Sequence, residues 1–283
     1  MNSYIFACLL VLTSSFVGLG NCDQVAPDFD IEFPEISRFR GVGDCNGMGI
    51  SEFEFINEGG TDAWDCGYNV FLKLDPFDGF QPIDWQSGEL SVDNIFVSNE
   101  ARFQNTDFTT QVRFQVDQTT MVYYVEVKWN GQVTSPAPDI QIYTNLGSDG
   151  DEEWLETSNS NGVPDTGDTW LLSDEMDGSD PIQLNVLASP GGNNMGLQYT
   201  DDFDGQWIGK GSLGTFQPGE SKSVLLFFRA YSYEDRSNIN TAVNLANQMD
   251  EKYLVSSHLV DFLSDQLDYV QNWSKSRRRV KTQ

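Results

Sequence analysis

The side chains best suited to chemistry in this sequence are oxygen donors gathered in one Asp-, Asn- and Gly-rich stretch. Within the run Asn159-x-Asn161-Gly-Val-x-Asp165-x-x-Asp168, oxygen-bearing residues alternate, a glycine permits a sharp turn and a carboxylate closes the loop. Ca²⁺ takes six to eight oxygen ligands in flexible loops, so this spacing predicts a calcium site. Thr157 stands where a first Asp is usual, and Asp168 replaces the usual bidentate Glu, which makes the pattern incomplete.

A second group of oxygen donors precedes the first in the same stretch. It comprises Asn145, Asp149, Asp151, Glu152 and Glu153, and it offers hard oxygens close together. Ca²⁺ suits such flexible oxygen sites, whereas Mg²⁺ requires a tighter octahedral site. The structural alternative for both groups is a polar loop whose side chains bond to nearby backbone in Asx turns. In so acidic a chain both readings remain open.

The sequence offers little support for catalysis. It has one His and no GxSxG, HExxH or phosphate-loop pattern, and its 43 acids have no spacing that selects a glycosidase pair. We therefore expect a non-enzymatic protein. Five tryptophans adjoin acidic or Gly-rich turns, where exposed rings could stack on sugars, although core packing is the usual role of such rings. They are Trp64, Trp85, Trp154, Trp170 and Trp207.

The formal net charge of −27 restricts the partners that this protein can have. All 43 acids lie between Asp23 and Asp268, whereas five of the 16 basic residues lie in the last ten. A body so acidic repels nucleic acid and anionic lipid and concentrates cations. Two explanations stay open: solubility in a salty medium that screens self-repulsion, or contact with calcium or a mineral surface.

The N-terminal residues predict export. Residues 4–20 form a short apolar run with Gly18 and Gly20 before a cut at residue 21, the shape of a signal peptide. Outside the cell a pair of cysteines usually forms a disulfide. A Cys45–Cys66 disulfide would stabilise the folded protein by roughly 3 kcal/mol. The sequon at Asn272 could carry a glycan. We expect a secreted, extracellular protein with no membrane span.

The remaining chain predicts an all-β fold, an antiparallel β-sandwich with a C-terminal pair of amphipathic helices. Residues 23–50 suggest an extended segment, and short alternating strands follow from residue 51, the strongest at 121–129. Asn130-Gly131 after that strand predicts a tight hairpin. Such strands between Gly, Asn, Asp and Pro are typical of sandwiches.

The domain organisation follows from the same patterns. We expect a signal peptide at 1–20, a β-sandwich at 21–236, C-terminal helices within 237–273 and a basic tail at 274–283. The sandwich would form either one unit or two halves, 21–100 and 101–236. Apolar residues at helical spacing place the helices at about 239–252 and 257–273.

The order of several segments resembles a known family. An aromatic strand is followed by NLGSDGD, DTWLLSDE, DPIQLNVL and FQPGESKSVLLFF, and then by an Ala/Leu/Asn-rich helical stretch ending in NW. This order, over roughly residues 100–273, resembles a β-sandwich domain that recurs in large secreted or surface proteins, many of them bacterial. The resemblance implies an adhesive or surface character and no catalytic residue.

Together these features predict a secreted, acidic, non-enzymatic matrix or surface protein. It would bind calcium through its Asp/Asn loops, in a mineralised or adhesive matrix, with matrix proteins or glycans as further partners. The alternative, prompted by the tryptophans near turns, is a carbohydrate-binding or accessory module of a glycan-degrading system.

Overall fold

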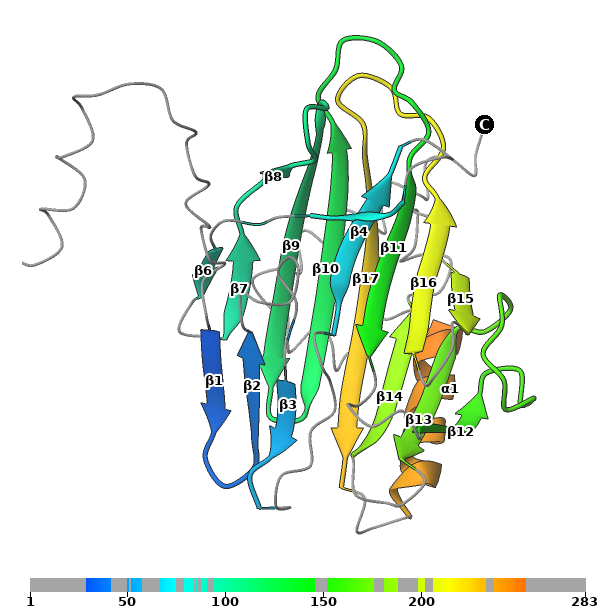
Figure 1. Cartoon of the computed structure of the whole chain (residues 1–283). Helices are drawn as coiled ribbons and strands as arrows, with labels where there is room; N and C mark the ends of the chain where they lie inside the picture. Colours follow the sequence, from blue (N-terminus) through cyan, green and yellow to red (C-terminus); the bar gives the residue numbers. More distant parts are fainter. Residues whose placement is uncertain are drawn as a thin grey trace, which may run out of the picture.

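The protein folds into stacked antiparallel β-sheets with one helix on the outside (Figure 1). The computed structural model describes most of the sandwich, in segments separated by gaps. These segments are residues 29–41, 50, 52–57, 67–74, 79–83, 85, 88–90, 94–145, 152–175, 181–187, 198–201, 206–232 and 237–252. The predicted antiparallel sandwich is confirmed.

The largest sheet has nine strands in the order β12-β13-β14-β17-β10-β9-β7-β6, with β8 also paired to β9. Its strands are β6 (Gly88–Leu90), β7 (Ile95–Ser98), β8 (Ala101–Arg102), β9 (Phe108–Asp117), β10 (Thr120–Trp129), β12 (Glu152–Thr157), β13 (Trp170–Glu175), β14 (Ile182–Leu187) and β17 (Ser221–Tyr231). Strands β9 and β10, each ten residues long, are joined by a two-residue turn in which Gln118 has a φ of 53°. This sheet carries the face on which the candidate site lies.

Two smaller sheets cover one face of the large sheet. The five-stranded sheet has the order β15-β16-β11-β4-β5, and the three-stranded sheet has the order β1-β2-β3. Their strands are β1 (Phe29–Phe33), β2 (Ser37–Gly41), β3 (Glu52–Phe55), β4 (Asn69–Lys73), β5 (Gln81–Pro82), β11 (Asp139–Asn145), β15 (Gln198–Asp201) and β16 (Gln206–Ser212). Because β4 pairs with β11 and β7 pairs with β9, segments on both sides of residue 100 contribute to the same sheets.

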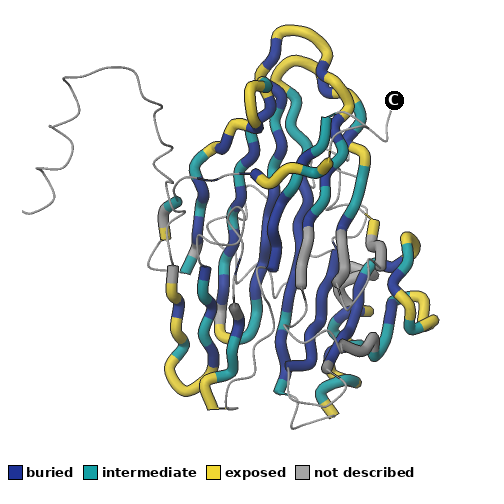
Figure 2. The backbone as a smooth tube through the Cα atoms, viewed as in Figure 1, coloured by how far each residue is buried: buried dark blue, intermediate teal, exposed yellow. Residues whose placement is uncertain are grey.

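The main hydrophobic core lies between the large sheet and the two smaller ones. Alternation along β10 and β17 sends every second side chain into it, among them Val125 and Phe228. Phe53 of β3 meets Phe228 of β17 edge to face, with ring centroids 5.6 Å apart. The strands are therefore buried along the centre of the sandwich and exposed mainly at its ends (Figure 2).

A second core lies on the opposite face of the large sheet, beneath helix α1 (Asn238–Lys252). The helix packs on β13 and β14, and its Ala242 and Ala246 are fully buried. Small residues at this spacing let the helix approach the sheet closely. The prediction of a helix at 239–252 is confirmed, and the second one, at 257–273, lies outside the described residues.

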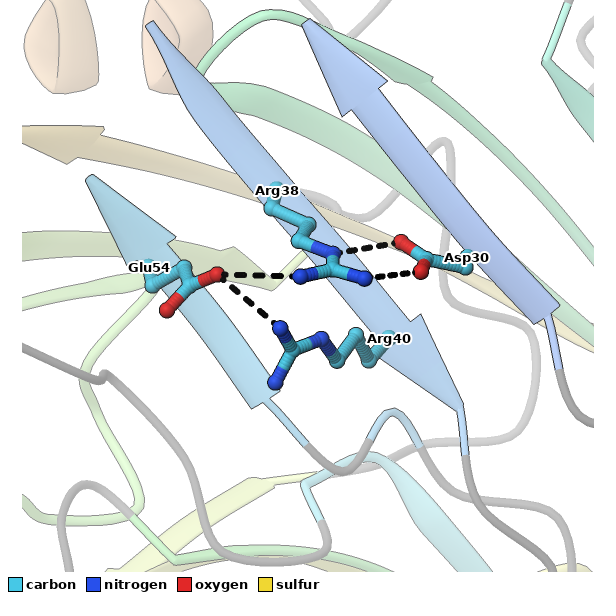
Figure 3. Close-up of polar contacts among 4 residues, drawn as sticks. All are labelled: Asp30, Arg38, Arg40 and Glu54. Carbon is cyan, nitrogen blue, oxygen red and sulfur yellow. Dashed lines mark hydrogen bonds and ion pairs between the residues drawn. The ribbon is translucent and has the colours of Figure 1, made fainter. Parts of the chain in front are cut away.

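The three-stranded sheet places a ladder of charges on its outward face (Figure 3). Arg38 forms a bidentate ion pair with Asp30 on β1, and its other nitrogen lies 3.8 Å from Glu54 on β3. Arg40 also contacts Glu54, at 3.3 Å. The hydrogen bond from Arg38 lowers the pKa of Asp30. Acid and base alternate across the strands, so each of the two arginines lies beside a carboxylate.

Two local predictions are wrong. Asn130-Gly131 does not close a hairpin, because the chain leaves β10 and crosses to β11 in the other sheet. Gly131 is required there by the indole of Trp129, whose ring would lie 2.2 Å from an added Cβ. In addition, residues 29–41 form a strand pair and not an extended segment, since alternating residues such as Ile31 and Phe39 reach the main core.

Candidate functional site

The Asx loop, residues 158–169, connects β12 to β13 at the edge of the large sheet. The predicted acidic loop was longer, but strand β12 occupies part of it. Three of the predicted ligands are brought together in the loop. Thr157 Oγ1 lies 2.9 Å from Asn159 Oδ1 and 3.1 Å from Asn161 Oδ1, and both amide nitrogens donate to Asp165 Oδ2, at 2.8 and 3.0 Å.

Asp168 belongs to the same loop but has a different role. It is only 3% exposed, and its carboxylate accepts hydrogen bonds from Ser158 Oγ at 2.9 Å, the Asn159 amide at 3.1 Å and the Asp165 amide at 2.9 Å. Ser158 in turn accepts from the Thr169 amide. These bonds join the beginning of the loop to its end, so Asp168 stabilises the conformation of the loop.

The oxygens of Thr157, Asn159, Asn161 and Asp165 are chemically suited to a hard cation. Even with both oxygens of Asp165, these five side-chain oxygens fall short of the six to eight that Ca²⁺ takes, so backbone carbonyls or water would complete the shell. The backbone amide of Gly167 and the two Asn side chains donate to Asp165 and lower its pKa, which keeps it ionised. Calcium binding here stays a prediction.

The other predicted sites cannot be placed in the same way. Asn145 ends strand β11, while Asp149 and Asp151 lie outside the described residues, as do Cys45, Cys66 and Asn272. Among the described residues, no three His, Cys, Asp or Glu side chains gather as a metal site would require. Within the same segments, no helix is long and apolar enough to cross a bilayer.

The tryptophans give no ring platform where the structure describes them. Trp85 is fully buried and donates from Nε1 to the Thr110 carbonyl at 3.2 Å, and Trp170 is 2% exposed beneath α1. Both rings fill cores, so neither can stack on a sugar. Trp64 lies outside the described residues, and the side chains of Trp154 and Trp207 are not described.

A polar group lies on the large sheet, on the face that carries α1; four of its five members are half-exposed, and the fifth, Tyr124, is buried at 8% exposure. We define this polar strip as Gln111, Arg113 and Gln115 of β9 with Tyr124 and Glu126 of β10. Alternation puts all five on one face, while their neighbours Val112, Phe114 and Val125 enter the main core. The strip went unnoticed in the sequence because such polar positions usually mark a solvated sheet face.

Strand register brings the members of the strip into contact. Arg113 lies directly opposite Tyr124, and Gln111 lies directly opposite Glu126, so their Cβ atoms are roughly 4.5–5.5 Å apart. Arg113 donates from Nε and Nη2 to Gln111 Oε1, at 3.2 and 2.8 Å. Tyr124 donates to Glu126 Oε2 at 3.4 Å.

The chemistry of the polar strip is varied for so small an area. It holds a guanidinium and amide groups that donate, a carboxylate that accepts and a phenol that does both. Glu126 is the one acid of the strip and supplies its carboxylate acceptor. A hydroxyl-rich ligand would find both donors and acceptors there.

Comparison with known proteins finds relatives only at the level of the fold. No family model and no curated protein sequence matches the chain. A proposed aldose 1-epimerase of Escherichia coli K12 is 10% identical over 73% of this chain and 99% of its own, with a TM-score of 0.47. A galactose mutarotase-like protein of Lactobacillus casei is 10% identical over 72% and 100% of the two chains, with a TM-score of 0.47.

A polysaccharide lyase is similar over 73% of this chain and 32% of its own, at 10% identity and a TM-score of 0.42. At such identities and scores, these similarities concern the arrangement of the sheets and assign no role to any residue. The similar folds are those of sugar-processing proteins, so the predicted resemblance to a surface-protein domain is wrong.

The same finding corrects the predicted function. The reading of the chain as a calcium-binding matrix or biomineral protein is overturned, because the folds that it resembles belong to carbohydrate-processing proteins. The expectation of a non-enzymatic protein is wrong on the same ground, since enzymes use this arrangement of sheets. The sequence had suggested the sugar-related role only as its alternative.

Proposed function

We propose that this protein binds carbohydrate on the polar strip as part of a glycan-processing system. One observation carries the proposal: strand register sets a half-exposed guanidinium, amides and a carboxylate around the buried phenol of Tyr124 on one sheet face. The strip lies on two long adjacent strands of the sheet, which hold its members in fixed relative positions.

Sugar hydroxyls suit this arrangement because each one both donates and accepts. Planar groups such as the Arg113 guanidinium and the Glu126 carboxylate can each bond two neighbouring hydroxyls at once, which selects their spacing and orientation. Tyr124 is buried, and its hydroxyl donates to Glu126, which helps to hold that carboxylate in place.

We propose that the protein acts outside the cell. The support comes from the apolar run at residues 4–20 and from the acidic composition, which suits a salty exterior. Glycans of cell walls and of the extracellular space are the ligands that such a protein would meet.

A glycan array followed by calorimetry tests the proposal. We expect the full chain to bind a subset of oligosaccharides. Glu126→Gln and Arg113→Met should each weaken binding at least tenfold, since each removes a charged hydrogen-bonding group. Glu100→Gln, on an exposed residue outside the strip, is the matched control for charge and should bind normally.

Two results would count against the proposal. The first is an array with no glycan above background, together with tyrosine and tryptophan fluorescence unchanged by polysaccharide. The second is wild-type affinity in both strip variants. Either outcome would make the strip an ordinary solvated face.

A further inference from the structure

Beyond the polar strip, the same face of the sheet carries Arg229 and Tyr231 at the end of β17. Thr120 lies directly opposite Arg229 and is four residues along β10 from Tyr124. At about 3.4 Å per residue, Arg229 is therefore about 14 Å from the strip's centre. That separation exceeds one sugar ring, so a ligand touching both places is an oligosaccharide.

Arg229 lacks the partner that an arginine usually has. Its guanidinium lies 5.2 Å from the centre of the Tyr231 ring, and its Nε is buried with no hydrogen-bond acceptor in the described part of the chain. This occurs in a protein with 43 acidic and 16 basic residues. Arg38 and Arg102, in contrast, each form an ion pair with a carboxylate.

Tyr231 has the same deficit. It is 8% exposed, and its buried hydroxyl has no hydrogen-bond partner among the residues that the structure describes. Burial raises the pKa of this phenol, so the hydroxyl keeps its proton and remains able to donate. Buried polar atoms are almost always paired in native proteins, so two orphan donors from adjacent positions on one face call for an acceptor.

We propose that Arg229 and Tyr231 form a subsite for the carboxylate of a uronic acid residue, within a glycan chain held on the polar strip. This inference rests on the proposed function and names its substrate class. The guanidinium edge and the phenol hydroxyl would donate to the carboxylate oxygens, which satisfies the orphan atoms.

A carboxylate fits this subsite better than a sulfate or phosphate ester. It is planar and carries one charge, which matches the flat fork of a guanidinium. The protein's net charge of −27 repels every anion at long range, and a phosphate monoester near −2 more strongly than a carboxylate. The attraction to Arg229 therefore has to offset the least long-range repulsion when the ligand is a carboxylate.

Calorimetry with three related ligands tests the inference: an oligogalacturonate, its methyl ester and a sulfated galactan oligosaccharide of equal length. We expect the acid to bind roughly 10- to 100-fold more tightly than the ester, the value of one charged hydrogen-bonded contact. Arg229→Met should remove this preference, because it weakens binding of the acid much more than binding of the ester. Tyr231→Phe should reduce the preference, and Arg102→Met, with the same change in net charge at an exposed site, should preserve it.

The outcomes separate the inference from the proposed function. If acid and ester bind the wild type equally, or if the sulfated ligand binds more tightly than the acid, the inference is wrong while carbohydrate binding stands. If Arg229→Met weakens acid and ester alike in a folded protein, Arg229 is not a carboxylate subsite. If no ligand in any class binds, both proposals fail. The comparison in the wild type and in Tyr231→Phe remains decisive if Arg229→Met does not fold.

Discussion

Replacing Asp168 by Asn should destabilise the protein more than its conservative shape suggests. Three donors point at the two carboxylate oxygens of Asp168, from Ser158 Oγ, the Asn159 amide and the Asp165 amide. An Asn at this position puts an NH₂ group where one oxygen was, so at least one donor loses its acceptor and faces another donor. A lost hydrogen bond to a charged group is worth about 1.5–3 kcal/mol, and the surviving bonds become neutral and weaker.

The expected loss is therefore about 3 kcal/mol, or a fall of about 6–12 °C in Tm for a protein of this size. Urea unfolding and calorimetry would measure it, with Asp107→Asn on an exposed carboxylate as control. Ser158→Ala and the double variant complete a cycle, in which coupling above about 0.5 kcal/mol is expected because the two side chains share a bond. A loss of stability below 0.5 kcal/mol for Asp168→Asn would refute the stabilising role of this carboxylate. So would a double variant whose loss equals the sum of the two single losses.

Three further predictions concern the loop and the core. The pKa of Asp165 is lower in the folded protein than in the unfolded chain, where it is about 3.9. Its ionised carboxylate therefore stabilises the loop fully above pH 3.9, and this stabilisation is lost as the pH falls through the folded-state pKa. Carbon-13 NMR of the carboxyl group should measure a pKa below 3.9, and a pKa at or above 3.9 would contradict the prediction. If the Asx loop takes up Ca²⁺, a hundredfold excess over Kd stabilises the protein by about 2.7 kcal/mol, and Asn161→Ala weakens the effect; no heat and no shift in Tm at millimolar Ca²⁺ would exclude it. Phe228→Ala should cost about 3–5 kcal/mol in denaturant unfolding, since the ring is fully buried against Phe53; a cost under 1 kcal/mol would show that the sheets pack differently.

The fold was largely predictable because the alternation of apolar and polar residues along each strand shows which of its faces is buried. The run at 121–129 and the helix near 239–252 were both recognisable from periodicity alone. Strands β1 and β2 were missed, since their alternation is diluted by Pro, Gly and Asp around them. Strand β12 was missed because its acidic residues resemble the loop that follows it.

The candidate site was less predictable, for a different physical reason. Periodicity says which face a residue occupies and nothing about which residue it meets across a strand. The pairing of Arg113 with Tyr124 depends on the register that the two-residue turn at Gln118 imposes. Had that turn been identified as the hairpin in place of Asn130-Gly131, the polar strip could have been assembled from the sequence.

The position of β17 has a consequence for how the chain reaches its native state. This strand is formed by the last segment of the sheet to be synthesised, yet it sits at the centre, between β10 and β14. Until residues 221–231 leave the ribosome, both neighbours present unpaired backbone edges that invite association with other chains. Assembly must therefore be late and slow, and a chain cut short before residue 221 should aggregate instead of forming a smaller sandwich.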